Sequence, residues 1–366
     1  MTLDPVALLT RMLEIPSVST QEAELAHVLT TEMARLGFDS FVDEAGNAVG
    51  ITGAGPDLVL LGHIDTVPGQ IPVRIENGRL YGRGAVDAKG PFATFICAAA
   101  RLAASGERLP FRLVLIGAVE EEAASSKGAH HVAGRYRPFA CVIGEPSGWD
   151  RITLGYKGRL LVDGFWEQPM SHSAGRESSA AERAVACWND VAAHCATYNQ
   201  GRERLFDQLL PSLRTICSRS DGLTDQAELT IGVRLPPDVP PETLASVIAG
   251  HSHGGQLRFR DLCPAYQADK NNPLVRAFLR SIRAAGGTPG FLLKTGTSDM
   301  NVVGPVWRCP ILAYGPGDSN LDHTPDEHIL IDEYLRAIRV LEDALRRLTE
   351  VGEEQRSNSA RDGAVV

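Results

Sequence analysis

Apolar segments that end directly in acidic or histidine residues place the tightest limit on how this chain can fold. Short apolar runs such as Leu58–Leu61 predict buried strands. Four of these apolar segments are followed by histidine or acidic residues. In chain order these residues are His63 and Asp65 after the first segment, Glu120–Glu122 after the second, Glu145 after the third and His323 after the fourth. Because the carboxyl ends of parallel strands meet at one edge of a sheet, these residues indicate an α/β enzyme with its site at that edge.

The spacing of the other elements supports a mainly parallel sheet. Strands are expected near 41–52, 58–62, 72–76, 111–119 and 140–144, and helices over 4–15 and 89–104. Ser19 and Glu22 match a capping box, which predicts that a further helix opens at this point. Strands that alternate with helices are typical of parallel sheets.

The pattern changes near residue 151, which predicts an inserted domain. Strands are expected at 156–166, 227–235 and 256–260, with helices at 178–198 and from Pro241. The earlier pattern returns at 273–286, 311–314 and 332–348. We therefore expect a discontinuous α/β domain (1–155 and 263–350), a smaller inserted α+β domain (156–262) and a disordered tail (351–366).

Composition excludes several classes of protein. With 43% hydrophobic residues the chain has enough apolar mass for a core, and its net charge of −9 argues against nucleic-acid binding. No apolar run is long enough to span a membrane, and the first residues do not resemble a secretion signal. The seven cysteines are widely spaced without a C-x-x-C pair, so we expect a reducing, cytoplasmic location.

The strand-end residues together predict a metal centre. Glu120–Glu122 alone could be a solvated acidic turn, but two histidines and several carboxylates gathered at one sheet edge need a compensating cation. Mixed nitrogen and oxygen donors suit Zn²⁺, Co²⁺ or Mn²⁺. One carboxylate can bridge two such ions, as in two-metal hydrolases.

The order and spacing of these motifs resemble the M20 metallopeptidase family, which includes the ArgE/DapE deacylases. The resemblance covers about residues 1–350 and implies a di-metal catalytic domain with two divalent ions, zinc or cobalt. It implies one ion on His63, Asp87 and Glu145, and a second on Asp87, Glu122 and His323, with Asp87 bridging. It further implies Asp65 as the partner of His63 and Glu121 as the general base, although three consecutive glutamates leave that assignment open by one position.

The resemblance also implies roles for the inserted domain, which is similar to the lid and dimerisation domain of the family and predicts a homodimer. His172 resembles the lid histidine that donates to the developing oxyanion. Arg234 resembles a carboxylate-binding lid arginine, and each of these two could instead be an ordinary surface residue. The loop before the last histidine resembles a substrate-binding loop, with Lys294, Gly296, Thr297 and Ser298 as candidates.

Within the family, three segments are most similar to the LysK group of amino-group-carrier-protein lysine/ornithine hydrolases: 119–128, 293–301 and 321–327. Such enzymes release lysine, in some members ornithine, from the γ-carboxyl of the C-terminal glutamate of a small acidic carrier protein, in lysine and arginine biosynthesis. The alternatives are a free-metabolite deacylase (acetylornithine deacetylase or succinyl-diaminopimelate desuccinylase), a small peptidase, or a carrier-binding protein without activity.

The net charge of −9 conflicts with an acidic partner, so docking would need a local basic patch. The residues that could supply it lie in or beside the inserted domain: Arg151, Lys157, Arg159, Arg176, Arg258, Arg260 and Lys294.

Overall fold

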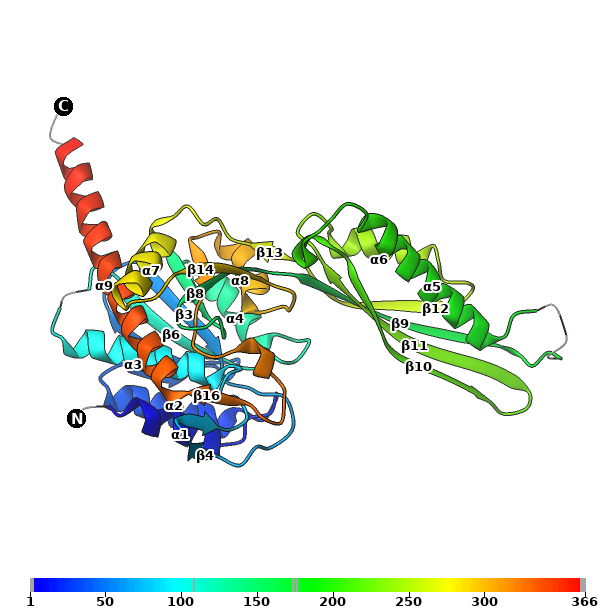
Figure 1. Cartoon of the computed structure of the whole chain (residues 1–366), viewed down its shortest axis with the longest axis horizontal. Helices are drawn as coiled ribbons and strands as arrows, with labels where there is room; N and C mark the ends of the chain where they lie inside the picture. Colours follow the sequence, from blue (N-terminus) through cyan, green and yellow to red (C-terminus); the bar gives the residue numbers. More distant parts are fainter. Residues whose placement is uncertain (1–2, 108, 173–174, 176, 363–366) are drawn as a thin grey trace. The chain divides into compact units, whose positions relative to one another are not determined.

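The computed structural model describes residues 3–107, 109–172, 175 and 177–362. The chain divides into two compact units (Figure 1). Unit 1 contains the residues up to Leu154, then Ala268–Leu292 and the chain from Ser298 onward, whereas unit 2 contains Gly155–Gln267 and Leu293–Thr297. The expected inserted domain, 156–262, lies inside unit 2.

Unit 1 is built on a mixed sheet, which confirms the predicted α/β class. The strand order is β1 (Asp39–Val42), β2 (Ala48–Gly53), β6 (Arg112–Ala118), β3 (Asp57–His63), β7 (Ala140–Gly144), β15 (Ile311–Ala313) and β8 (Arg151–Tyr156). The central strands β6, β3, β7 and β15 are parallel, and their neighbours on either side are antiparallel. The end of β8 pairs with β13 (Tyr266–Gln267), and β14 (Gly290–Lys294) also pairs with β8.

Helices cover this sheet. They are α1 (Pro5–Glu14), α2 (Ala23–Arg35), α3 (Lys89–Ala104), α4 (Lys127–Arg135), α7 (Pro273–Ala284), α8 (Asp299–Trp307) and α9 (Ile331–Asp362). The central helix α3 packs against α1 and α9 as well as against β3, β6 and β7. A smaller sheet of β16 (His328–Leu330), β5 (Arg79–Tyr81) and β4 (Arg74–Glu76), and a short 3-10 turn at Ser319–Leu321, complete the unit.

Three glycines bring α3 close to the strand ends. Gly62 on β3 is in register with Gly117 on β6 and with Gly144 on β7. A Cβ atom at Gly117 would lie 2.9 Å from the Phe92 ring, and one at Gly144 would lie 2.9 Å from the Phe95 ring. Such distances leave no room for a methyl group, so glycine is what lets the first turn of α3 sit against the sheet.

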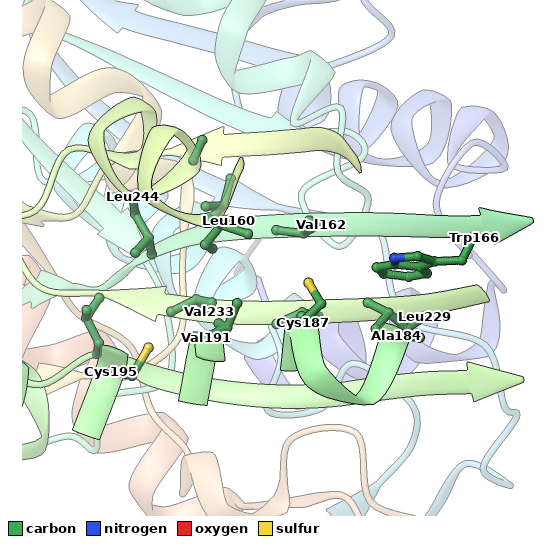
Figure 2. Close-up of a cluster of buried hydrophobic side chains, with 14 of the residues drawn as sticks. Leu160, Val162, Trp166, Ala184, Cys187, Val191, Cys195, Leu229, Val233 and Leu244 are labelled. Carbon is green, nitrogen blue, oxygen red and sulfur yellow. The ribbon is translucent and has the colours of Figure 1, made fainter. Parts of the chain in front are cut away.

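Unit 2 is an antiparallel sheet with helices on one face. The strand order is β10 (Leu210–Ser220), β11 (Thr224–Leu235), β9 (Gly158–Pro169) and β12 (Gln256–Cys263), and the helices are α5 (Ala180–Tyr198) and α6 (Pro241–Ala249), with a 3-10 turn at Leu205–Asp207. Alternate strand residues such as Val162, Leu229 and Val233 pack against Cys187 and Val191 of α5 (Figure 2). Trp166 closes one end of this core, where its indole N–H donates to the Ser252 carbonyl at 2.8 Å.

Several sequence expectations differ from the structure, among them the single strand expected near 41–52, which instead forms the antiparallel pair β1 and β2. The capping box at Ser19 and Glu22 is absent, because α2 begins at Ala23 and the Ser19 hydroxyl instead donates to Asp65 at 2.7 Å. The expected disordered tail from residue 351 is helical as far as Asp362. A helix already anchored by its first turns propagates easily through good helix formers such as Glu353–Arg356. In the described part of the chain, no helix is long and apolar enough to cross a membrane.

Candidate metal centre and active site

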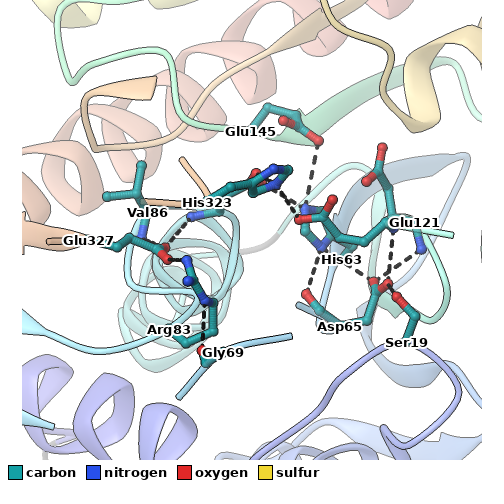
Figure 3. Close-up of polar contacts among 12 residues, drawn as sticks. Ser19, His63, Asp65, Gly69, Arg83, Val86, Glu121, Glu145, His323 and Glu327 are labelled. Atoms are coloured by element: carbon teal, nitrogen blue, oxygen red, sulfur yellow. Dashed lines mark hydrogen bonds and ion pairs between the residues drawn. The ribbon is translucent and has the colours of Figure 1, made fainter. Parts of the chain in front are cut away.

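The carboxyl ends of the parallel strands bring the predicted ligands of unit 1 together (Figure 3). His63 is the last residue of β3, Glu121 and Glu122 follow β6, and Glu145 follows β7. The remaining two come from outside the strands, since Asp87 precedes α3 and His323 lies in the loop between β15 and β16. Because β6, β3 and β7 are parallel, their carboxyl ends lie at the same edge of the sheet, which explains this convergence.

His63 is buried and held in one orientation. Its Nδ1 lies 3.0 Å from the Asp65 carbonyl oxygen and 3.4 Å from the Asp65 Oδ1. Its Nε2 therefore points to the other side, 3.1 Å from Asp87 Oδ1 and 4.0 Å from Glu145 Oε1. A histidine whose second nitrogen is fixed by a neighbouring group presents the first as a metal ligand.

Asp87 lies between the two histidines. One carboxylate oxygen is 3.1 Å from His63 Nε2, and the other is 3.1 Å from His323 Nε2. His323 Nε2 is also 2.9 Å from Glu122 Oε1. One donor atom each from His63, Asp87 and Glu122 lies within 4.8 Å of the others, which is close enough to share an ion. Two oxygens facing two different imidazoles are what a bridging carboxylate requires.

The acidic turn after β6 separates its three glutamates. Asp65 Oδ1 accepts the N–H of Glu121 and Asp65 Oδ2 accepts the N–H of Glu122, both at 3.0 Å. Glu120 has a φ of 59° and turns away, so that its carboxylate accepts the Ser125 hydroxyl at 2.6 Å. Asp65 thus orients His63 through its backbone carbonyl oxygen, and it holds the acidic turn through both of its carboxylate oxygens.

A buried glutamate connects the Asp87 loop to the His323 loop. Glu327 Oε1 accepts the N–H groups of Val86 and Asp87 at 2.9 and 3.1 Å. Its other oxygen is 2.7 Å from Arg83 Nη1, and Arg83 in turn donates to the Gly69 carbonyl. Glu327 follows His323 by four residues, so this one carboxylate fixes both loops relative to each other.

The crowded carboxylates and imidazoles perturb one another. Burial and the neighbouring Glu145, Asp299 and Glu122 raise the pKa of Glu121 well above its ordinary value, although His63 opposes them. Hydrogen bonds to Asp87 and Glu122 raise the pKa of His323 to about 10. Burial opposes a charged Asp87, but the bonds from His323 and His63 prevail and lower its pKa. These shifts follow from the many charged groups that meet at the strand ends, whose charge a bound cation would also balance.

The candidates in unit 2 and its adjoining loop occupy different environments. His172 is exposed on the segment after β9. Arg234 on β11 donates to the Thr297 hydroxyl at 3.3 Å. Lys294 ends β14, Gly296 follows it in a bend, and the buried Ser298 accepts the Met300 N–H as the N-cap of α8.

The structure adds site residues that sequence reasoning missed, namely Ser19, Glu22, Arg83, Glu327 and Asp299. Glu22 accepts the Glu120 N–H at 3.1 Å, so the apparent capping box is a support for the acidic turn. Asp299 is buried and neither of its oxygens has a hydrogen-bond partner among the described residues, and burial raises its pKa to about 7. Ser19 and Glu22 carried a sequence signal that was read as a helix cap, whereas Asp299 and Glu327 lay in segments noted for the family resemblance without a role of their own.

Comparison with known proteins agrees with this geometry. Residues 59–347 match the family described as Peptidase family M20/M25/M40. The LysW-lysine hydrolase of Deinococcus radiodurans is 49% identical over 350 residues, which cover 93% of this chain and 96% of that protein. The LysW-lysine/LysW-ornithine hydrolase of Saccharolobus islandicus is 30% identical over 80% of this chain and 81% of that protein.

Solved structures share the fold at lower identity. The M20 family metallo-carboxypeptidase Sso-CP2 of Sulfolobus solfataricus has a TM-score of 0.77 at 18% identity, covering 95% of this chain and all of that chain. The YXEP protein of Bacillus subtilis, described as a dinuclear metal-binding peptidase, has a TM-score of 0.69 at 14% identity, covering 94% of this chain and 98% of that chain.

Proposed function

This chain belongs to peptidase family M20/M25/M40 and is a metal-dependent amide hydrolase, and on that premise we propose that it releases lysine from the carrier protein LysW in lysine biosynthesis. The bond to be cut is the amide between the lysine α-amine and the γ-carboxyl of the C-terminal glutamate of the carrier. Ornithine is proposed as a second product, which would add a role in arginine biosynthesis.

The main support for the proposed substrate is the 49% identity to a LysW-lysine hydrolase over nearly the full length of both chains. The peptidases of the same fold are only 14–18% identical, so they support the fold and not a peptide substrate. A carrier-binding protein without activity would not need the complete set of donors that meets at the strand ends.

The donor set fits two divalent cations, for which we propose zinc or cobalt. Two imidazoles and three carboxylates supply both nitrogen and oxygen ligands, and the two oxygens of Asp87 face different histidines. Following the family, His63 and Glu145 would hold one ion, His323 and Glu122 the other, and Asp87 both. Two bound ions would polarise the amide carbonyl and lower the pKa of a water molecule.

The proton transfers are assigned to Glu121. The hydrogen bond from its backbone N–H to Asp65 holds Glu121 beside the proposed metal ligands. Its raised pKa suits a group that takes a proton and later returns it. In the proposed reaction Glu121 Oε accepts a proton from the attacking water and delivers it to the leaving α-amine. Asp65 keeps His63 and the Glu121 turn in place throughout.

Residues of unit 2 and its adjoining loop are proposed to bind the substrate. His172 would donate to the oxyanion that develops on the amide carbonyl. Arg234, supported by Thr297, would bind the lysine carboxylate, because a guanidinium binds carboxylates through two parallel hydrogen bonds. Lys294, Gly296 and Ser298 remain candidates in the same loop.

The partner is proposed to be a small acidic carrier. Unit 2 is proposed to act as a lid and as the dimer contact, and the protein is proposed to work in the cytoplasm.

The set of basic residues expected to dock the carrier needs correction. Lys157 is fully buried and donates to the carbonyls of Leu205 and Phe206 at 3.0 Å. Arg159 and Arg260 pair with Asp261 and Asp163, and Arg176 lies outside the described residues. Arg258 stays exposed and is the better candidate for docking.

The decisive test measures amino-acid release from lysine-loaded carrier and from N-acetylornithine at the same enzyme concentration. We expect a higher kcat/KM on the loaded carrier. Faster turnover of N-acetylornithine or of succinyl-diaminopimelate would establish the free-metabolite deacylase instead, and faster turnover of a dipeptide would establish the peptidase.

A further inference from the structure

The face of the unit 2 sheet opposite α5 and α6 places like charges against each other. Arg159 on β9 lies directly opposite Arg234 on β11 in the antiparallel register. Each arginine is next in sequence to a core residue, Arg159 to Leu160 and Arg234 to Val233 (Figure 2). Since neighbouring side chains of a strand point to opposite faces, both arginines lie on the face away from the core. Like charges in directly opposed positions destabilise a sheet, so their presence needs a reason.

A bulge in β10 adds a third arginine. Leu213 pairs with Ile231 and Thr215 with Thr230, so Arg214 is the extra residue between them. The Cδ of Arg214 lies 3.2 Å from the place where a Cβ of Gly232 would be. Gly232 precedes Arg234 by two residues on this face, so the missing side chain provides the room in which the Arg214 stem lies. Bulges commonly redirect a side chain in this way.

The charge of this arginine cluster (Arg159, Arg214 and Arg234) is only partly balanced. Arg159 pairs with Asp261, whereas Arg214 and Arg234 form no ion pair with the described residues. Burial, together with the proximity of Arg159 and Arg214, lowers the pKa of Arg234, and Asp261 only partly opposes this effect. Other arginines of the same sheet are neutralised, Arg260 by Asp163 and Arg219 by Glu228. Positive charge therefore accumulates at one end of the face, where an anion would relieve it.

We propose that Arg214 binds the free α-carboxylate of the carrier's C-terminal glutamate, next to the lysine carboxylate bound by Arg234. This inference rests on the proposed function, whose substrate carries these two carboxylates. Arg234 is half-buried and suits the small amino acid, whereas Arg214 is exposed on the edge strand β10, where a protein-sized carrier can reach it. The cluster would then recognise a carboxylate that free acyl-amino acids lack.

Two small substrates that differ in one carboxylate test the assignment. One is N-acetyl-γ-glutamyl-lysine, linked through the lysine α-amine, and the other is 4-acetamidobutanoyl-lysine, which lacks the glutamate α-carboxylate. For Arg214→Gln we expect kcat/KM to fall about 10- to 100-fold on the first substrate, the usual worth of a charged hydrogen bond, and to stay unchanged on the second. Arg214→Lys should recover part of the loss.

Arg219→Gln is the matched control, because Arg219 lies on the same strand but is already bonded to Gln226 and Glu228. It should leave kcat/KM unchanged on both substrates, and thermal unfolding should show all variants folded. Equal losses on the two substrates for Arg214→Gln, or no loss on either, would overturn the carboxylate assignment while leaving lysine release intact. Failure of the parent enzyme on both substrates and on loaded carrier would instead overturn the proposed function, and this inference with it.

Discussion

Three adjacent glutamates acquire different environments through single hydrogen bonds. The carboxylate of Glu120 is occupied by Ser125, that of Glu122 by His323, and that of Glu121 is directed among the buried acidic groups. The Asp65 carboxylate accepts hydrogen bonds from two consecutive N–H groups, those of Glu121 and Glu122. If these bonds came from residues one position earlier or later, the three glutamates would exchange environments. The geometry therefore favours Glu121 over its neighbours as the proton carrier.

Glu121→Gln should reduce kcat by roughly 10²- to 10⁴-fold, the usual contribution of general acid–base catalysis, because the amide cannot take up a proton. Metal content should remain that of the parent, and atomic absorption measures it. Glu120→Gln is the control and should keep most of the activity, since its carboxylate faces Ser125. A large loss with Glu120→Gln and none with Glu121→Gln would place the base one residue earlier.

Metal binding should release protons from His323, whose pKa is raised to about 10 by Asp87 and Glu122. Since a ligand imidazole must be neutral, apparent metal affinity should rise with pH until about 10. Without metal, the positive charge of protonated His323 stabilises the folded state. This contribution is complete below about pH 6.5 and is lost as pH rises toward 10. Calorimetric titration with Zn²⁺ near pH 7.5, in buffers of different ionisation enthalpy, should show proton release that His323→Asn diminishes. Buffer-independent heats would contradict the expectation.

At the scale of elements, the site depends on how closely α3 approaches the strands. Asp87 is carried immediately before α3, and α3 rests on the aligned Gly62, Gly117 and Gly144. A side chain on Gly117 or Gly144 would press on the Phe92 or Phe95 ring of α3 and so disturb the helix that follows Asp87. Glu327 and Glu22 act similarly from other elements, by fixing the loops that carry Asp87 and Glu120.

Gly117→Ala should destabilise the protein by about 1–3 kcal/mol and lower metal affinity, because the added methyl group overpacks against Phe92 and Ile64. Gly134→Ala is the control, since Gly134 lies in α4 with open space around it and alanine favours a helix. Thermal unfolding of both variants measures the difference. Equal midpoints would show that the sheet accommodates the methyl group.

At the scale of the whole molecule, long-range charge works against an acidic partner. The net charge is −9, and the arginines of unit 2 are largely paired with their own carboxylates. Attraction must therefore come from local groups such as Arg258 and the arginine cluster, and local attraction between exposed charges is sensitive to salt.

Activity on loaded carrier should fall steeply between low salt and ~0.3 M salt, where the screening length shortens to roughly 6 Å, while activity on 4-acetamidobutanoyl-lysine, which lacks the glutamate α-carboxylate, should change little. Arg258→Glu should lower kcat/KM for the carrier only, because Arg258 is exposed and a charge reversal there weakens association. Initial rates over a salt series measure both effects. A common salt response for the two substrates would argue against electrostatic docking of the carrier.

The sequence by itself determined the α/β class and the set of strand-end residues that we propose as metal ligands. Both depend on local patterns, since an apolar run with polar residues at its end is readable wherever it occurs, as at Leu58–His63 and Ala140–Glu145. The long helix α9 shows the limit of such patterns, because its polar last turns gave no periodic signal although the structure continues the helix to Asp362.

Only the tertiary structure decided which side chains serve those ligands. Ser19 and Glu22 matched a helix cap locally, yet they bond to Asp65 and Glu120, 46 and 98 residues away. Lys157 looked like a docking charge but is buried against backbone carbonyls, and Arg214 joins Arg159 and Arg234 only through the register and bulge of three strands. Hydrogen bonds and charge contacts between distant segments depend on how strands pair and helices pack, and residue order alone does not express that pairing.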